Sequence, residues 1–325
     1  MRSFAYAASS SVEEATSNTG DQSAFLAGGT TLVDLMKLDV MTPSRVIDIN
    51  QLPMRGIKLT SAGLHIGALE KMSEVAEHPD VVAHYPVISQ ALLKSASAQI
   101  RNMASMGGNL LQRTRCGFFR DVTTPCNKRE PGSGCPPIDS WNRGFAILGT
   151  SSSCVATHPS DLAVALVALE ASVRLQTRTG ERVVKLDDFY LLPGNTPEKE
   201  NQLQPGELIT EILVPPLPWA QRSLYLKVRD RESYEFALAS VALALDVDGS
   251  TIRDARVAVG GVGTKPWNLP NVRDALIGKP LNQQHFEAAA QVATDGAKPL
   301  RNNGFKVELV QKTIVRALMS LGGLG

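Results

Sequence analysis

The chain has 325 residues, enough for about two domains that each bury a hydrophobic core. Hydrophobic residues make up 43% of the sequence and charged residues 20%, a composition that excludes disorder as the dominant state. The 33 basic and 32 acidic residues nearly cancel, so the chain lacks the bulk positive charge that holds a nucleic-acid backbone, and we expect no nucleic-acid partner.

No stretch of the sequence has the ~18 or more consecutive apolar residues of a membrane-spanning helix. The first segment, MRSFAYAASSSVEEATS, lacks the apolar centre of a secretory signal and already contains two glutamates. We therefore expect a cytoplasmic protein without a membrane span. Export to the periplasm would require a partner subunit that carries a signal.

A short apolar run followed by two glycines lies near the N-terminus. Residues 23–27 predict a strand, and the hydrophobic spacing from Leu32 predicts a helix after the turn GGTT at 28–31. Paired glycines let the backbone turn sharply and present several N–H groups to one point, and the helix start adds its positive dipole end. The loop is a candidate phosphate cradle, although an ordinary turn would have the same sequence.

A second glycine pair follows a long helical pattern between residues 87 and 103. In the run ASMGGN at 104–109, the glycines permit close backbone approach, and Ser105 and Asn109 supply side-chain hydrogen bonds. A helix C-cap would explain the first glycine equally well. Two such loops in one chain indicate a ligand more strongly than either loop alone.

All four cysteines lie within 39 consecutive residues, at Cys116, Cys126, Cys135 and Cys154. Prolines and glycines in this region prevent a regular helix and favour a loop that converges on a point. Three interpretations compete: buried structural thiols, two disulfides, or a metal site with four thiolates. Disulfides are typical of small secreted domains, and structural zinc usually has close Cys-x2-4-Cys pairs that are absent here. A loop can also wrap an iron-sulfur cluster with wide spacings, so the spacing alone leaves the metal open.

Basic side chains are in excess around the first cysteines. Between residues 101 and 129 the charged residues are Arg101, Arg113, Arg115, Arg120, Lys128 and Arg129, with Asp121 as the one acid. Four thiolates around a 4Fe-4S core leave a net negative charge, which nearby cations would compensate. A solvated basic loop is the alternative.

Strands and helices alternate through the rest of the chain. Beyond residue 56 we expect a strand at 64–68, a helix from about Ser160, and strands at 171–176 and 182–184. The proline-rich stretch at 215–218 is the best candidate for a domain boundary.

The C-terminal third predicts a smaller unit. Residues 240–247 and 255–259 flank an Asp-Gly turn and predict an antiparallel hairpin. The last helix is expected to pack on the core through one face, formed by Val307, Val310, Ile314, Ala317 and Leu321.

Common catalytic and nucleotide-binding motifs are absent from the sequence. It contains no G-x-G-x-x-G after a strand, no G-x4-G-K-[ST], no H-E-x-x-H and no G-x-S-x-G. The five histidines also lack metal-ligand spacing. Rossmann or P-loop nucleotide binding, zinc peptidases and esterases are therefore disfavoured.

Four runs together resemble the FAD-binding subunits of molybdenum hydroxylases, the xanthine dehydrogenase and carbon monoxide dehydrogenase flavoprotein family. They are AGGTTLVDLMK at 27–37, QIRNMASMGGNLLQ at 99–112, HPSDLA at 158–163 and LKVRDRESYEFALASVA at 226–242. The runs NLLQRTRC at 109–116 and CNKREPGSGC at 126–135 narrow the resemblance. With them the chain is similar to the bacterial aldehyde oxidoreductase FAD subunits that also carry a 4Fe-4S cluster.

The resemblance implies an α+β fold with two domains. Residues 1–220 would form a two-lobed FAD-binding domain of the vanillyl-alcohol oxidase (PCMH) type, with lobes at 1–55 and 56–220 and the cysteine loop at 113–154. Residues 221–325 would form a smaller α+β C-terminal domain of the CO dehydrogenase flavoprotein type.

The resemblance also implies an oxidoreductase that works as a heterotrimer. A large subunit with a molybdenum-pterin cofactor would oxidise the aldehyde, and a small subunit would carry two 2Fe-2S clusters. This chain would pass their electrons through FAD to an external acceptor. No catalytic acid, base or nucleophile for aldehyde oxidation is then expected on this chain.

Site residues follow from the same resemblance. The first loop would contact the FAD pyrophosphate and the flavin edge through Ala24, Phe25, Leu26, Ala27, Gly28, Gly29, Thr30, Thr31 and Leu32. The second loop would hold the diphosphate through Ala104, Ser105, Gly108 and Asn109. Asp161 would meet the ribose or adenine end, Ile209 would give a backbone contact, and Lys227 would lie by the flavin. The 4Fe-4S ligands would be Cys116, Cys126, Cys135 and Cys154.

Two alternatives from other functional classes remain. One is a stand-alone FAD-dependent reductase of the same fold, which would need its own substrate pocket and no partner subunits. The other is a non-enzymatic scaffold in which the cysteines bind structural zinc.

Overall fold

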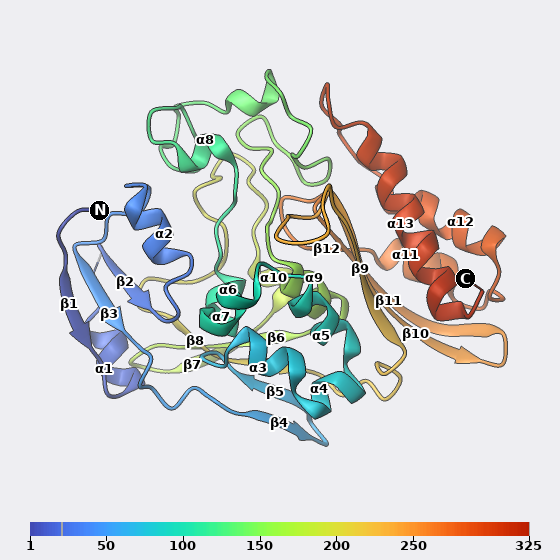
Figure 1. Ribbon diagram of the computed structural model, residues 1–325, viewed down its shortest axis with the longest axis horizontal. Coiled ribbons are helices and arrows are strands. Elements are labelled where there is room, and N and C mark those ends of the chain that lie inside the picture. The colour runs from blue at the N-terminus through green and yellow to red at the C-terminus, as the bar shows by residue number, and fades with distance from the viewer. Residues whose placement is uncertain (21, 325) are drawn as a thin grey trace.

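The computed structural model describes residues 1–20 and 22–324 and contains three β-sheets with helices between and beside them (Figure 1). The sheets have three strands in the order β1-β3-β2, five in the order β4-β5-β8-β6-β7, and four in the order β12-β11-β10-β9. Within the described ranges, no helix is both long and apolar enough to cross a membrane.

The first sheet belongs to the N-terminal lobe and is parallel. Its elements, in chain order, are β1 (Ala5–Ala8), α1 (Val12–Ser17), β2 (Ser23–Leu26), α2 (Leu32–Lys37) and β3 (Arg45–Asp48). Parallel neighbours need a crossover connection, and α1 and α2 provide these crossovers. The predicted strand, glycine turn and helix at 23–37 are confirmed.

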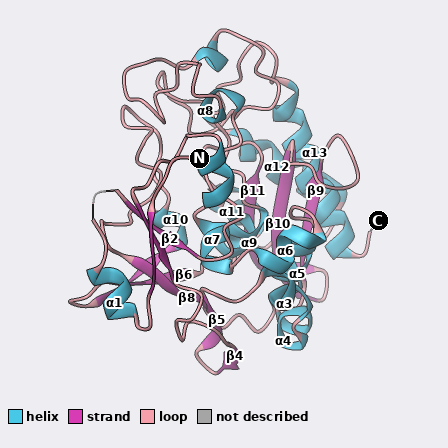
Figure 2. Cartoon of the chain, turned by 60° about the vertical axis from the view of Figure 1, so that its left-hand side comes forward, coloured by secondary structure: helices cyan, strands magenta, loops and turns pink. Residues whose placement is uncertain are grey.

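The five-stranded sheet is antiparallel and forms the base of the second lobe (Figure 2). Its strands are β4 (Ile57–Thr60), β5 (Gly63–Gly67), β6 (Ser172–Gln176), β7 (Glu181–Lys185) and β8 (Leu208–Val214). The lobe's helices are α3 (Met72–Glu77), α4 (Pro79–His84), α5 (Pro86–Leu93), α6 (Ala98–Met103), α7 (Met106–Leu110), α9 (Asp161–Ala168) and α10 (Leu186–Phe189). The strands expected at 64–68, 171–176 and 182–184 are thereby confirmed.

Helix α9 is buried at every position, which explains its almost wholly apolar sequence DLAVALVA. It packs against α5 and α7 on one side and against strands β10 and β11 of the C-terminal sheet on the other. Ser160 caps its N-terminus by accepting a hydrogen bond from the Ala163 amide. The helix predicted from Ser160 thus forms the joint between the second lobe and the C-terminal part.

The single helical pattern expected over 87–103 is wrong in its middle. Helix α5 ends at Leu93 and α6 begins at Ala98, with Ala96 between them at a positive φ of 49°. Ser97 caps α6, and the Ser95 hydroxyl donates back to the Ala91 carbonyl. Serine side chains that bond to nearby backbone compete with the helix, and here they end it.

The cysteine loop is mostly irregular, as expected, with two short helices, α8 (Gly117–Arg120) and η1 (Pro136–Ile138) (Figure 1, green). Arg129 holds it by donating to the carbonyls of Phe118 and Phe119. Near its end, Ile147 and Leu148 join the core of the C-terminal part. The loop therefore contacts both parts of the chain.

The C-terminal part combines the four-stranded antiparallel sheet with helices on one face (Figure 1). Its elements are β9 (Ser223–Val228), β10 (Ala239–Asp248), β11 (Thr251–Gly260), β12 (Trp267–Asn268), α11 (Pro270–Leu276), α12 (Gln283–Gln291), η2 (Val292–Thr294) and α13 (Phe305–Gly322). The predicted hairpin is confirmed as β10–β11. The predicted face of α13 packs on the sheet, with Val310, Ile314 and Ala317 fully buried.

Candidate functional site

A cavity of about 1190 Å³ lies where the first lobe, the second lobe and the segment after β9 meet. Its lining contains seven residues singled out from the sequence: Thr30, Thr31, Ala104, Gly108, Asn109, Asp161 and Lys227. The structure therefore brings parts of both glycine loops and both charged residues to one place. We call this space the main cavity.

The first glycine loop offers unused hydrogen-bond donors. Within the described part of the chain, the backbone N–H groups of residues 28–32 donate to no protein acceptor. Gly29 has a φ of +72°, a conformation that glycine adopts without strain. Thr31, which precedes α2, makes no side-chain cap to the helix. Successive free amides of this kind suit phosphate oxygens.

The two glycine loops contact each other directly. A Cβ atom on Gly28 would lie 1.9 Å from the carbonyl oxygen of Met103, the residue before Ala104. The same carbonyl accepts a hydrogen bond of 2.9 Å from Lys71 Nζ. Only glycine at position 28 permits this approach, which brings the first loop against the start of the second.

The second loop uses most of its own amides inside the protein. The Met106 and Gly107 amides donate to carbonyls of the 68–70 segment, and the Gly108 amide donates to Ser105 Oγ at 3.2 Å. The Asn109 side chain accepts from Ser160 Oγ at 2.6 Å. This loop therefore shapes the cavity wall, whereas the first loop holds the free donors.

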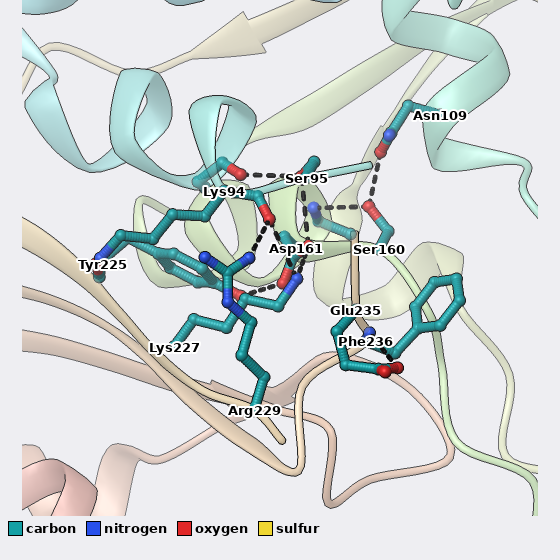
Figure 3. A network of polar contacts seen from close by, with 12 residues as sticks. Lys94, Ser95, Asn109, Ser160, Asp161, Tyr225, Lys227, Arg229, Glu235 and Phe236 are labelled. Carbon is teal, nitrogen blue, oxygen red and sulfur yellow. Dashed lines mark hydrogen bonds and ion pairs between the residues drawn. The ribbon is translucent and has the colours of Figure 1, made fainter. Parts of the chain in front are cut away.

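Asp161 and Lys227 form a buried ion pair of 2.8 Å (Figure 3). The side chain of Lys227 is only 1% exposed, and its Nζ also donates to the Lys94 carbonyl at 3.1 Å. Tyr225 Oη donates to Asp161 Oδ1 at 2.6 Å, and Ser95 Oγ donates to Oδ2 at 3.2 Å. Burial and the neighbouring Asp161 carboxylate raise the pKa of Tyr225, which stays a hydrogen-bond donor.

Other residues singled out from the sequence lie away from the cavity lining. Strand β2 is partly exposed along its whole length at the edge of its sheet. Ser105 is buried behind the second loop and caps α7. Ile209 lies inside β8, in the main core between β5 and β6, so the structure does not bring it to the cavity.

Several cavity residues were missed by the sequence reasoning. They are Asp34 from α2, Ser95 and Ala96 from the α5–α6 break, Arg115 and Arg120 from the cysteine loop, and Arg231, Tyr234, Glu235 and Phe236 after β9. The last group has a local signal, because two aromatic residues stand in an otherwise polar segment, and both are substantially exposed. The others depend on tertiary contacts that no local pattern reveals.

All four cysteines line a second cavity of about 290 Å³ inside their loop. Cys126 and Cys154 are buried, and all four are free thiols. A hydrogen bond from Cys135 lowers the pKa of Cys154, and the nearby Lys128 charge acts in the same direction. Burial raises the pKa of Cys116 to about 11. The loop thus converges on one point, as its composition predicts.

Among the described residues, no three His, Cys, Asp or Glu side chains are arranged to hold one ion. A zinc ion requires its sulfur ligands at about 2.3 Å from one centre. The four thiols do share one cavity, and Cys135 and Cys154 lie within hydrogen-bonding distance of each other.

The basic residues of this region have partners that sequence counting did not reveal. Arg113 and Lys128 pair with Glu200, and Arg115 and Arg120 pair with Asp34. Although burial opposes its ionisation, the two cations hold the pKa of Glu200 below its usual value. These cations are therefore paired with acids from elsewhere in the chain, while Lys128 also lines the cysteine cavity and acts on Cys154.

A third cavity of about 790 Å³ lies between the other two. It shares Arg115, Asp161 and Phe236 with the main cavity, and Thr114 and Cys116 with the cysteine cavity. Partly buried His158 lines it, and desolvation lowers the pKa of this histidine to about 3, so its ring is neutral. The third cavity is therefore adjacent to both of the others.

Comparisons with known proteins agree over nearly the whole chain. A family model described as the FAD binding domain in molybdopterin dehydrogenase matches residues 2–217, and the CO dehydrogenase flavoprotein C-terminal domain matches residues 224–323. The chain is 47% identical to the aldehyde oxidoreductase FAD-binding subunit PaoB of Escherichia coli, over 90% of each protein. It is 29% identical to the glyceraldehyde dehydrogenase medium chain of Sulfolobus acidocaldarius, over 97% of this chain and 96% of that protein.

Solved structures share the fold. Carbon monoxide dehydrogenase from Hydrogenophaga pseudoflava matches with a TM-score of 0.77 at 24% identity, over 99% of this chain and 98% of that one. Quinoline 2-oxidoreductase from Pseudomonas putida matches with a TM-score of 0.75 at 20% identity, over 99% and 98%. The α+β fold expected from the sequence is therefore confirmed.

Proposed function

Because the chain belongs to the family of FAD-binding subunits of molybdenum hydroxylases, we propose that it is the electron-transfer subunit of a heterotrimeric aldehyde oxidoreductase. Its partners in this proposal are a large molybdenum-pterin subunit and a small subunit with 2Fe-2S clusters. The aldehyde class rests on the 47% identical relative, whose name gives that activity.

The observation that carries the proposal is the main cavity between two touching glycine loops. Bound FAD would accept electrons singly from iron-sulfur centres and release them to an external acceptor. The free amides of residues 28–32 would hold the phosphates, and the second loop would close the cavity from the other side.

Asp161 and Lys227 act together in this proposal. The resemblance assigns Asp161 to the ribose or adenine and Lys227 to the flavin, which would place the two residues at opposite ends of FAD. Their side chains, however, are 2.8 Å apart. We assign both to one segment of the cofactor. There Asp161 fixes the Lys227 ammonium, which supplies the positive charge.

We also propose that the four cysteines hold a 4Fe-4S cluster. The support is the cavity that all four cysteines line. The third cavity borders both the cysteine cavity and the main cavity, which supports a cluster next to the proposed FAD site. The domain division at residue 220 also belongs to the proposal, with the cysteine loop packed against helix α2 and against the C-terminal part.

An absorption spectrum with iron analysis tests the proposal on purified protein. We expect a flavin spectrum over a broad absorbance that reduction bleaches, with about four irons per chain. Co-elution of two further chains supports the heterotrimer, whereas a single chain that reduces an acceptor alone supports a stand-alone reductase. A colourless protein with bound zinc would refute both the flavin and the cluster.

Cys126→Ser tests the cluster assignment separately. Because a 4Fe-4S cluster takes four thiolates, this variant should lose most of its iron while FAD remains detectable. Val122→Ser is the matched control. Val122 is an exposed residue of the same loop, and the substitution introduces the same side chain. Normal iron content in Cys126→Ser would exclude Cys126 as a ligand.

A further inference from the structure

Helix α2 is tied to the cysteine loop by a three-residue ion-pair cluster. The Asp34 carboxylate accepts two hydrogen bonds from Arg120, at 2.7 and 3.0 Å, and one from Arg115 at 3.1 Å. The two arginines flank Cys116, because Arg115 precedes it and Arg120 ends the short helix that follows it. The hydrogen bonds from Arg120 are the main cause that lowers the pKa of Asp34, so the carboxylate is ionised.

An apolar contact reinforces this attachment. Leu35, next to Asp34, is 1% exposed and packs against Phe119 and Cys126. Cys116 borders the same small core. Two consecutive residues of α2 therefore contact the loop, one through charge and one through packing.

The rest of the first lobe is anchored elsewhere. Its own core joins the second lobe through Leu69 and Leu208, and α2 contributes no residue to that core. The free amides of residues 28–32 lead directly into α2. The position of these amides therefore depends on a helix whose side chains pack on the cysteine loop.

We infer that Asp34 is a positioning residue that transmits the order of the cysteine loop to the FAD-binding loop, so that cluster and FAD strengthen each other's binding. This inference rests on the function proposed above. Such coupling is reciprocal, because each group stabilises the same arrangement of α2 and the loop. Asp34 acts through the backbone that it places, and no contact between Asp34 and FAD is required.

The test compares FAD affinity with and without the cluster. The full-length protein is stripped of FAD, and half of it is depleted of iron with a chelator. FAD is then titrated by flavin fluorescence. For the unmodified sequence we expect iron loss to raise the dissociation constant of FAD about fivefold or more. Factors of this size are usual for coupled sites.

In Asp34→Asn we expect weaker FAD binding in the iron-loaded protein and little further change on iron removal. Its iron content should stay normal, which separates this effect from loss of the cluster. Asp39→Asn is the matched control, because it makes the same Asp-to-Asn change just beyond the end of α2. The Asp39 carboxylate lies 3.7 Å from the N-terminal amine. This control should behave like the unmodified protein.

Arg120→Gln breaks the same pairing from the other side and replaces Asp34→Asn if that variant does not fold. The double variant should bind FAD no more weakly than either single variant, because each substitution removes the same Asp34–Arg120 interaction. An unchanged iron effect in Asp34→Asn or Arg120→Gln would overturn the inference, even if FAD and iron are both present as proposed. Unmodified protein that binds FAD but no iron would instead remove the cluster from the proposed function, and this coupling with it.

Discussion

Gly28 shows how strictly one residue can be determined by its surroundings. A Cβ atom at this position would overlap the Met103 carbonyl, which belongs to the backbone and cannot rotate away. Gly28→Ala must therefore push the two glycine loops apart. Overpacking of this kind costs about 1–3 kcal/mol, which corresponds to roughly a 5- to 150-fold loss of FAD affinity.

Titration of FAD into the apoprotein measures this effect. Gly20→Ala is the control, because a Cβ atom on Gly20 would meet nothing within 4 Å. Iron content should be the same in both variants, since Gly28 lies outside the cysteine loop. Equal FAD affinity in the two variants would show that the contact between the loops does not shape the site.

At the scale of elements, the Asp161–Lys227 pair joins α9 to β9 across the boundary between the second lobe and the C-terminal sheet. Asp161→Asn leaves the Lys227 ammonium buried without its counter-charge. Removing one partner of a buried pair destabilises by about 3–5 kcal/mol. The double variant Asp161→Asn with Lys227→Met should be more stable than Asp161→Asn alone, because it removes the unpaired charge.

Urea unfolding of Asp161→Asn, Lys227→Met and the double variant, at one fixed FAD concentration, checks the prediction. Asp230→Asn serves as the control, since Asp230 forms an exposed pair with Arg143 and should change stability little. If the two substitutions at the buried pair were simply additive, the pair would contribute no coupling across this boundary.

Most elements of the fold can be predicted from local patterns, because strand and helix periods and turn residues are local properties. The glycine turn before α2, the β10–β11 hairpin and the buried face of α13 are examples. The α5–α6 break depends on serine side chains that compete with the helix, which periodicity does not register. The ion pairs of Asp34 and Glu200 join residues more than 70 positions apart, so a local charge count misjudged the basic segment.

At the scale of the whole molecule, Lys306 connects the C-terminal helix to the cysteine loop. It lies in α13, is fully buried, and donates to the carbonyls of Gly144 at 3.1 Å and Gly261 at 2.7 Å. Burial, with a smaller contribution from the Arg143 charge, lowers the pKa of Lys306 to about 7. A neutral amine has two N–H donors, which matches the two carbonyl partners.

This pKa makes the stability of the molecule depend on pH in a definite direction. Between pH 7 and 10.5 the unfolded chain keeps the Lys306 proton and the folded protein releases it. The free energy of unfolding should therefore increase with pH across this window, by an amount on the order of a few kcal/mol, and level off below it. Lys306→Met should lose this contribution and be less stable throughout, because the carbonyls of Gly144 and Gly261 lose their donor.

Urea midpoints are measured from pH 6 to 10.5 on the unmodified protein and on Lys306→Met. All other titrating groups are common to the two proteins, so their contributions cancel in the difference of unfolding free energy. The difference in unfolding free energy should widen as the pH rises above 7. Parallel curves would mean that Lys306 keeps its proton in the folded protein. The joint between α13 and the cysteine loop would then be held by a charged ammonium, and alkaline conditions would not strengthen it.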